Sequence, residues 1–367
     1  MKFTCGKDSL TEAVNIVQKA VSQKSTMPLL EGILMEAEEG ILKLSSNDLE
    51  IAIEYIIDAD VERIGSSVIN SKTFGEIVRK IEGDEVFIDM NEYFIINIDS
   101  RYSHFELKSI DSSGFPKLIE IDEKNKINIK NEDLKKIIKQ IIFAVSEDDN
   151  RPIFKGVFIE VEENTINFVA TDGYKLALRK IKTQENDNIF SCIIPGKALN
   201  EIYKILQSIN SEIMLYFSEN QLMFKTDKCK LVSRLIEGNY LNYKIMIPKE
   251  FTLSLTVKTK EILNSIERST IIMNDQLKNY LNFFIDDDKI IITANTENGS
   301  MREELTCETS GEKLDIRFNA KNLIETIKVI EEEEIKILFT TNVGPCSIIS
   351  KKEEDYNYLV MPLKIKA

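Results

Sequence analysis

The sequence predicts an α+β protein made of three copies of one module, each with two helices packed on antiparallel sheets of about eight strands. The first observation is a match without gaps between residues 152–181 and residues 28–57, which lie 124 positions earlier. The second is an apolar helix position that is repeated. It is Phe74 in the first copy, Leu199 in the second, 125 positions later, and Leu323 in the third, 124 positions after that. The third is a common order of helical and strand patterns in all three parts of the chain.

The matched segments share residues of special backbone chemistry as well as apolar ones. The pairs are Pro28 with Pro152, Gly32 with Gly156, Glu36 with Glu160 and Asp48 with Asp172. We interpret this as an internal duplication with domains at residues 1–124, 125–249 and 250–367. Short polar linkers are expected near Glu123–Asn125 and Pro248–Glu250. In the third copy, residues 280–295 fit the strand pattern with a one-residue slip.

Apolar residues at helical spacing predict six helices. In the first of them, Leu10, Ala13, Val14 and Val17 form one face. The six expected ranges are Asp8–Ala20, Ser71–Glu82, Asn131–Phe143, Gly196–Gln207, Lys258–Ile271 and Ala320–Ile330.

Alternating apolar residues between turn signals predict strands in the rest of each copy. In the first copy they are expected within residues 33–57, at 85–90, at 93–98 and at 104–108. Later strands are expected within 157–181, 213–236 and 280–305, and at 335–339 and 346–350, before the terminal apolar segment 358–363. Asp48 and Asp172 fall at equivalent turns, which indicates turn chemistry and not catalysis.

The charge of the chain is distributed unevenly. The chain has 367 residues with 47 basic and 61 acidic side chains, a net charge of −14. The six expected helices hold 14 basic and 10 acidic residues, so the helices are +4 and the remainder is −18. This asymmetry favours helices that face a polyanion, although Lys is also common on ordinary helix surfaces.

Composition limits the compartment and the redox state. The first 20 residues carry charges throughout, and no apolar run is long enough to span a bilayer, so we expect a cytoplasmic protein without a signal peptide. The five cysteines are scattered and form no C-x-x-C motif, which predicts reduced thiols.

The sequence contains no complete set of catalytic residues. His104 is the single histidine, and neither a phosphate-binding glycine motif nor a nucleophile elbow is found. The acidic run Glu331–Glu334 is typical of a solvated helix end. We therefore expect a non-enzyme without cofactor or metal. A carboxylate enzyme using Asp148 and Asp149 and a repeat scaffold that never encircles DNA are the alternatives.

Several motifs together resemble the bacterial DNA polymerase III beta subunit family, the sliding clamps, over nearly the whole length. They are Met1–Thr4, Met27–Leu30, Arg151–Phe154, Ala170–Ala177 and Val360–Leu363. The resemblance implies a non-catalytic processivity factor for the replicative polymerase. Two chains would join head to tail into a ring of six domains, with helices lining a central hole around duplex DNA.

The resemblance also implies roles for individual residues. The residues expected near DNA are Lys24, Lys72, Arg79, Arg151 and Lys197, to which the helix charges add Lys139. Some relatives carry aromatic residues where this chain has Pro152 and Ile153, so stacking on DNA is not expected there. The residues expected at the dimer joint are Tyr102, His104, Ile271 and Ile272.

The second implied site is a hydrophobic groove that captures short peptides from the polymerase III alpha subunit, the clamp loader, other polymerases and repair proteins. Its expected residues are Phe154, Thr171, Gly173, Tyr174, Lys175, Leu176, Met246, Val360, Met361, Pro362 and Leu363. A flexible Met accepts varied apolar anchors. Leu241 replaces a common Pro and Ile245 replaces an Arg of some members, so this wall should differ in depth and polarity.

Overall fold

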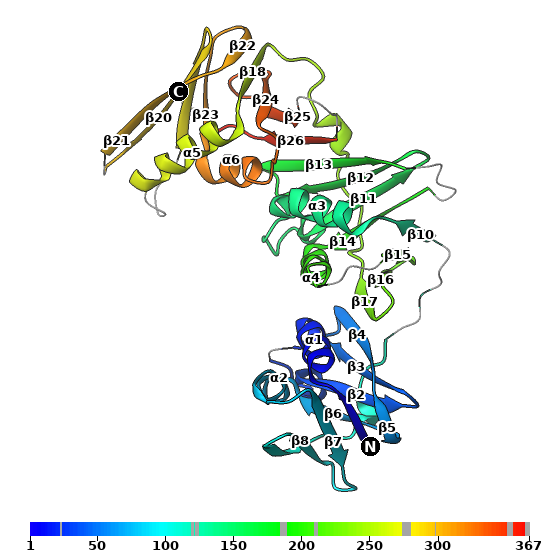
Figure 1. The fold of residues 1–367 in the computed structure, drawn as a ribbon. Helices are drawn as coiled ribbons and strands as arrows, with labels where there is room; N and C mark the ends of the chain where they lie inside the picture. Colours follow the sequence, from blue (N-terminus) through cyan, green and yellow to red (C-terminus); the bar gives the residue numbers. More distant parts are fainter. Residues whose placement is uncertain are drawn as a thin grey trace. The chain divides into compact units, whose positions relative to one another are not determined.

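The computed structural model describes residues 1–22, 24–118, 121, 125–183, 189–208, 212–273, 280–297, 299–350 and 355–363. The chain forms two compact units (Figure 1). The first unit holds residues 1–134 and 200–235, and the second holds residues 135–199 and 236–367. Residues of the expected middle domain, 125–249, occur in both units, and the domain boundaries stay a prediction. The first expected linker, at 123–125, lies mostly outside the described residues.

All six predicted helices are present. They are α1 (Lys7–Val17), α2 (Ser71–Lys80), α3 (Asn131–Ile141), α4 (Gly196–Leu206), α5 (Thr259–Ser269) and α6 (Ala320–Ile327). Three of them run into a short 3₁₀ turn, at Gln18–Ala20, Ile142–Ala144 and Thr270–Ile272, which explains why the apolar pattern extends beyond the α-helix itself. In the described residues, no helix has the length and apolar composition needed to cross a membrane.

The first unit contains two antiparallel sheets. The five-stranded sheet has the order β5 (Asp60–Arg63), β1 (Lys2–Gly6), β7 (Glu85–Met90), β8 (Ile95–Ser100) and β9 (Ser103–Lys108). The eight-stranded sheet has the order β10 (Asn125–Asn128), β15 (Met214–Phe217), β16 (Gln221–Lys225), β17 (Cys229–Arg234), β4 (Ile51–Asp58), β3 (Ile41–Asn47), β2 (Gly32–Glu38) and β6 (Gly65–Asn70). The strand expected at 93–98 begins two residues later, because Asn91 Oδ1 accepts hydrogen bonds from the amides of Tyr93 and Ile95 in a turn.

The second unit repeats this plan. Its nine-stranded sheet has the order β14 (Phe190–Pro195), β11 (Gly156–Glu162), β12 (Thr165–Thr171), β13 (Lys175–Lys182), β26 (Tyr356–Val360), β25 (Cys346–Ser350), β24 (Glu334–Phe339), β18 (Leu253–Lys258) and β22 (Glu308–Gly311). Its four-stranded sheet has the order β21 (Gly299–Thr306), β20 (Lys289–Thr296), β19 (Tyr280–Asp286) and β23 (Leu314–Asn319).

The internal repeat is visible in the strand registers. The hairpins β2–β3, β11–β12 and β19–β20 end on the pairs Glu38–Ile41, Glu162–Thr165 and Asp286–Lys289. These pairs are spaced by 124 residues each time. The one-residue slip expected in the third copy is therefore wrong, because the copy kept its hairpin length while its side chains diverged.

In each unit, helices pack against the sheets and build the core. In the first unit α1 and α2 contact each other, and α1 packs on β3 and β4 (Figure 1). Leu10, Val14 and Phe74 are almost fully buried beneath these helices. In the second unit α5 and α6 form the corresponding pair.

Two strands far apart in sequence join the copies within each unit. In the first unit β4 pairs with β17, with Ile51 opposite Ser233. In the second unit β13 pairs with β26, with Lys175 opposite Val360. Among the described strands, β9 and β21 each end a sheet and have no neighbour on their outer edge.

Candidate functional sites

A tight turn after β12 shapes one wall of the predicted groove. Asp172 Oδ1 accepts hydrogen bonds from the amides of Tyr174 at 2.8 Å and Lys175 at 2.9 Å. Gly173 has a φ of +91°, a left-handed conformation that suits glycine. The turn directs Tyr174 outward, so that 65% of its surface is exposed. Asp48 makes the equivalent bonds to Glu50 and Ile51, which confirms the predicted turn chemistry.

The chain that follows β26 forms the opposite wall. Because Val360 pairs with Lys175, the next residue comes level with the turn, and the Met361 amide donates to the Tyr174 carbonyl oxygen at 2.8 Å. Val360 is fully buried, Met361 is 37% exposed, and Pro362 and Leu363 are half-buried. The predicted groove residues at 171–176 and 360–363 thus lie together.

An apolar cluster lies under this surface. Its buried members are Val169, Leu176, Tyr243 and Leu359, and half-buried Phe158, Leu178, Tyr240, Leu241 and Ile247 pack against them. The ring of Tyr240 stacks on Phe158, with centroids 4.9 Å apart, and meets the edge of Phe154 at 5.9 Å. Sequence reasoning missed Phe158, Tyr240 and Tyr243, although the strand alternation at β11 already pointed to Phe158.

The segment 241–246 determines how apolar and how exposed this side of the predicted groove is. Leu241 contributes apolar surface to the cluster, whereas Ile245 and Met246 are exposed. Lys244 forms ion pairs with Glu160 at 3.0 Å and Glu162 at 2.8 Å and so ties this segment to β11.

Charged residues lie next to the turn after β12, at the edge of the predicted groove. The Lys175 side chain is only 8% exposed and forms ion pairs with Asp172 at 2.6 Å and Glu325 at 3.0 Å. Burial lowers the pKa of Lys175, but hydrogen bonds with the two carboxylates raise it above its usual value overall. Next to it is a hollow of about 340 Å³, lined in part by Arg151, Tyr174 and Lys321. Arg151, expected near DNA, thus lies beside the groove turn.

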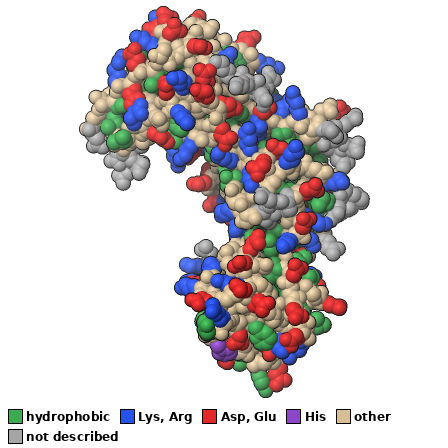
Figure 2. All heavy atoms as spheres, viewed as in Figure 1, with side chains coloured by type: hydrophobic (Ala, Val, Ile, Leu, Met, Phe, Trp, Pro, Cys, Tyr) green, Lys and Arg blue, Asp and Glu red, His purple; other side chains and the backbone are tan. Residues whose placement is uncertain are grey.

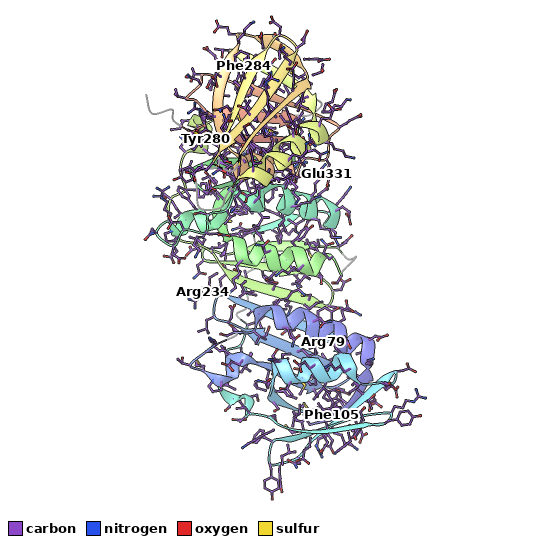
Figure 3. All side chains as sticks on the ribbon, turned by 90° about the vertical axis from the view of Figure 1, so that its left-hand side faces the viewer. Arg79, Phe105, Arg234, Tyr280, Phe284 and Glu331 are labelled. Atoms are coloured by element: carbon purple, nitrogen blue, oxygen red, sulfur yellow. The ribbon has the colours of Figure 1, made fainter. Side chains whose placement is uncertain are left out.

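The other residues expected near DNA are exposed on both units. Lys24, Lys72 and Arg79 belong to the first unit, and Lys139, Arg151 and Lys197 belong to the second. Arg79 on α2 donates hydrogen bonds to Asn15 of α1 and to Gln18 of the 3₁₀ turn that follows it, each at 2.9 Å (Figure 3). Lys139 pairs with Glu331 at 2.8 Å, and this hydrogen bond holds the pKa of Glu331 below its usual value.

A basic pattern repeats in the second helix of every copy. The second position of the helix is Lys72, Lys197 or Lys321. The residue seven positions later is Arg79, Lys204 or Lys328, of which Lys328 lies just past the end of α6. All six side chains are exposed. Sequence reasoning missed Lys204, Lys321 and Lys328, although comparing the repeats would have revealed them. Lys139 has no such counterparts, because Asn15 and Glu267 occupy the equivalent positions of α1 and α5.

Comparison with known proteins identifies the family. Sequence profiles described as the N-terminal, central and C-terminal domains of the DNA polymerase III beta subunit match residues 1–119, 128–242 and 244–364. The chain belongs to this family.

Similar proteins agree over the full length. A beta sliding clamp of Halalkalibacterium halodurans is 34% identical over 99% of this chain and 100% of its own length. The crystal structure of the DNA polymerase sliding clamp from Bacillus subtilis has a TM-score of 0.97 at 33% identity and covers 100% of both chains. The putative DNA polymerase III beta subunit from Eubacterium rectale has a TM-score of 0.95 at 31% identity and covers 99% of both chains. This beta subunit is a DNA sliding clamp, a non-catalytic processivity factor of DNA replication.

The residues expected at the dimer joint of this clamp lie on separate units. Tyr102 follows β8 and is exposed, and His104 on β9 has its Nδ1 2.7 Å from Asp99 Oδ1. Ile271 is 80% exposed in the second unit, where Ile272 is half-buried next to β21. The sequence reasoning missed Phe105 of β9, which is 37% exposed (Figure 3).

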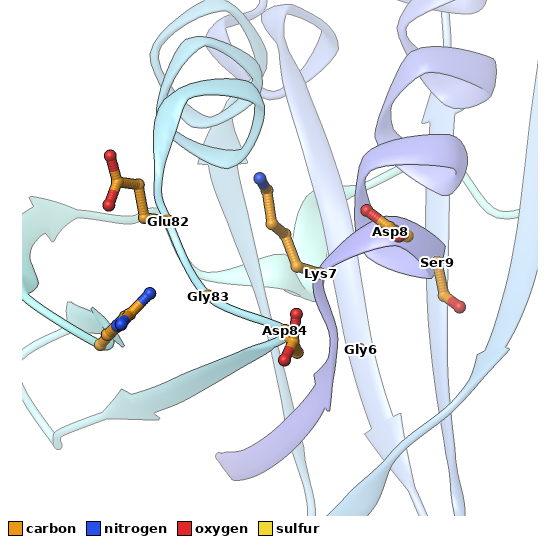
Figure 4. Close-up of a pocket in the computed structure, with 8 residues that line it drawn as sticks. Gly6, Lys7, Asp8, Ser9, Glu82, Gly83 and Asp84 are labelled. Carbon is orange, nitrogen blue, oxygen red and sulfur yellow. The ribbon is translucent and has the colours of Figure 1, made fainter.

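A polar hollow of about 600 Å³ lies in the first unit, between the start of α1 and the segment that follows α2 (Figure 4). Lys7, Arg101, Asp8, Glu82 and Asp84 are among the residues that line it. The Arg101 guanidinium lies over the Tyr102 ring at 4.8 Å. The hollow has the mixed charges of the whole visible surface, on which acidic and basic side chains are interspersed (Figure 2).

The acidic segment considered for an alternative enzyme serves a local structural purpose. Asp148 Oδ1 accepts from the backbone and side-chain amides of Asn150 at 3.0 and 2.8 Å, and Asp149 pairs with Lys155. Within the described residues, no group of three or more His, Cys, Asp or Glu side chains is placed to hold a metal ion.

Proposed function

We propose that two copies of this clamp join head to tail, with β9 of one chain pairing with β21 of the other. The chain already contains two joints of this kind, β4–β17 and β13–β26, and β21 is the third-copy equivalent of β4 and β13. Among the described strands, its outer edge has no neighbour, and neither has that of β9, the first-copy equivalent of β17. Unpaired edges favour pairing with another strand. These two free edges are the observation that carries the proposal.

The internal joints predict the register of the joint between subunits. Ile51 is opposite Ser233 in the first unit. The third-copy equivalent of Ile51 is Gly299, and the first-copy equivalent of Ser233 is Leu107, because the hairpins β8–β9 and β16–β17 correspond. In this register Met301 faces Phe105 of the partner subunit, and Arg302 faces His104 of the partner subunit.

Apolar side chains at both edges support this joint. Phe105 is exposed on β9, and Ile271 is exposed in the 3₁₀ turn that contacts β21. Burial of aromatic and aliphatic side chains in the centre of an interface is the main source of its stability. The proposed joint consists of the expected residues Tyr102, His104, Ile271 and Ile272, to which we add Phe105 and Met301.

The closed dimer holds duplex DNA by topology and contacts its phosphates weakly. The repeated cations of the second helices support this role, since one Lys and one further basic residue recur in each copy. Lys24, Lys72, Arg79, Arg151 and Lys197 belong to the proposed DNA-facing set, and Lys139 is its least supported member. Sequence-independent phosphate contacts permit sliding. Because replication of a bacterial chromosome takes place there, the clamp works in the cytoplasm.

The groove between Tyr174 and Met361 captures short peptides of the replicative polymerase, the clamp loader and repair proteins. Exposed Tyr174, Met246 and Met361 surround the buried apolar cluster, as in a site that accepts apolar anchors. The remaining residues of the proposed site are Phe154, Thr171, Gly173, Lys175, Leu176, Val360, Pro362 and Leu363.

The decisive experiment compares retention of the clamp on circular and linear DNA. The clamp is loaded on a nicked circular plasmid by a clamp loader, and half of the sample is then cut once with a restriction enzyme. Retention on the circle and loss from the cut DNA are expected, because a ring can slide off an end. Equal retention on both would reject topological holding. A monomer in gel filtration at micromolar concentration would reject the dimer.

A further inference from the structure

We propose that Arg317, beside the groove, binds a carboxylate on the partner peptide and so selects peptides with an acidic residue next to their apolar anchor. The proposal rests on the groove proposed above. It assigns a binding position on the four-stranded sheet, next to the C-terminal wall of the groove.

The backbone places Arg317 close to that wall. The Leu363 amide donates to the Arg317 carbonyl oxygen at 2.8 Å, so the segment after Met361 runs along the free edge of β23. Leu363 is two residues beyond Met361, and an extended chain spans roughly 3.3 Å per residue. The backbone of Arg317 therefore lies within reach of the next one to three residues of a peptide anchored at Met361.

The guanidinium group of Arg317 is held in a fixed orientation. It lies over the ring of Tyr280 on β19, 5.2 Å from the ring centre. Tyr280 lies on the same strand of the second unit as Phe284 (Figure 3). Stacking on an aromatic ring leaves the planar edge of a guanidinium available for two parallel hydrogen bonds to a carboxylate.

The Arg317 side chain keeps an unused hydrogen-bond donor. Within the part of the chain that the structure describes, the buried Nε of Arg317 has no hydrogen-bond partner. Asn282 is the residue directly opposite Arg317 on β19. Buried polar atoms without partners are rare in native proteins and indicate a missing ligand or water.

The charges nearby also favour an acidic ligand. Lys175, the buried cation of the groove, is already paired with Asp172 and Glu325. No ion pair of Arg317 is found among the described residues. Arg302 lies on the same row of the sheet, across Asn282 and Thr293, and pairs with Glu304 at 3.4 Å. The described part of the chain supplies no carboxylate to Arg317, so its guanidinium group is suited to attract one from a ligand.

Two synthetic peptides test this inference. Both carry the same Leu and Phe anchors and a fluorescent label, and one has Asp on each flank where the other has Asn. Binding is measured by fluorescence polarisation. The native clamp is expected to prefer the acidic peptide by about fivefold, as for an exposed ion pair. Replacing Arg317 by Gln should abolish this preference and leave binding of the Asn peptide unchanged.

The control variant is Arg234→Gln, which removes an exposed Arg in the first unit (Figure 3). It should keep the full preference. Arg317→Lys keeps the charge without the planar fork and should give an intermediate preference. Thermal melting of each variant verifies that it is folded.

Three results would overturn the proposal. They are equal weakening of both peptides by Arg317→Gln, an unchanged preference in that variant, and an effect on single-stranded DNA binding without an effect on either peptide. The variant Met361→Ala tests the groove independently of Arg317, because it should weaken the binding of both peptides. Unchanged binding in Met361→Ala would reject the groove whatever Arg317→Gln does.

Discussion

Leu49 and Gly173 occupy the same position of the same turn, 124 residues apart, and both have a left-handed backbone, with φ of +75° and +91°. Asp48 and Asp172 precede them and close each turn with side-chain hydrogen bonds. The second copy has the residue that this conformation prefers, whereas the first copy holds a β-carbon in a strained conformation. The turn is therefore determined by its aspartate and its flanking strands.

Replacing Leu49 by Gly should stabilise the protein. A left-handed conformation costs an ordinary residue roughly 1–2 kcal/mol, and the greater freedom of Gly in the unfolded chain offsets about 0.5–1 kcal/mol of the gain. Leu49 is exposed, so the substitution removes little packing. A small rise in Tm is expected. Gly173→Ala is the reverse case and should lower Tm, because its β-carbon would come within 3.1 Å of Arg151. Equal decreases of Tm in both variants would contradict the strain.

Met361→Ala should weaken peptide binding at the groove by about 1–3 kcal/mol, the usual range for truncating a central interface residue. Arg234 provides the matched control, because its amide donates to the Glu50 carbonyl oxygen at 3.2 Å, in the way that Met361 bonds to Tyr174. Arg234→Ala should leave peptide affinity unchanged, since Arg234 belongs to the first unit, whereas the apolar cluster under the proposed groove belongs to the second. Isothermal titration calorimetry measures both, and a similar weakening in the two variants would remove Met361 from the site.

The three lysines at the second position of α2, α4 and α6 should contribute together to DNA binding. Changing Lys72, Lys197 and Lys321 together to Gln should reduce the slope of log affinity against log salt by roughly 0.9 for each phosphate that is no longer neutralised. Lys139→Gln should change the slope less than the triple change does, because it removes a single cation that has no counterpart in the other copies. Binding to a duplex with blocked ends is measured at several salt concentrations. A larger effect of Lys139 than of the three lysines would reject the repeated pattern.

Phe105→Asp should convert the dimer into monomers, because it places a charge in the apolar centre of the proposed joint. Phe284 offers a matched control, since it is an exposed Phe on a strand outside that joint, 41% accessible against 37% for Phe105 (Figure 3). Phe284→Asp should remain dimeric. Sedimentation velocity distinguishes the two outcomes, and a dimeric Phe105→Asp clamp would exclude β9 from the joint.

The apolar spacing of the sequence was sufficient for all six helices, because a surface helix must bury one stripe of side chains whatever its neighbours are. Its errors occurred where tertiary contacts decide. The slip expected at residues 280–295 came from diverged side chains, whereas the hairpin kept its length. Tyr240 was missed because a loop residue has no periodic pattern that reveals its stacking on Phe158.

The threefold repeat, the positions of its helices and hairpins, and the aspartate turns could be predicted from the order of residues alone, whereas residues 171–176 and 360–363 were assigned to the candidate groove through the resemblance to the sliding-clamp family. The pairing of β4 with β17 and of β13 with β26, and the edges that stay free, became known from the folded chain. Hairpins and helices form from local hydrogen bonds and spacing, whereas pairing between distant strands depends on which edges the folded copies bring together. Arg317 shows the same limit, since its sequence neighbours do not reveal that Tyr280 orients it beside the segment that follows Met361.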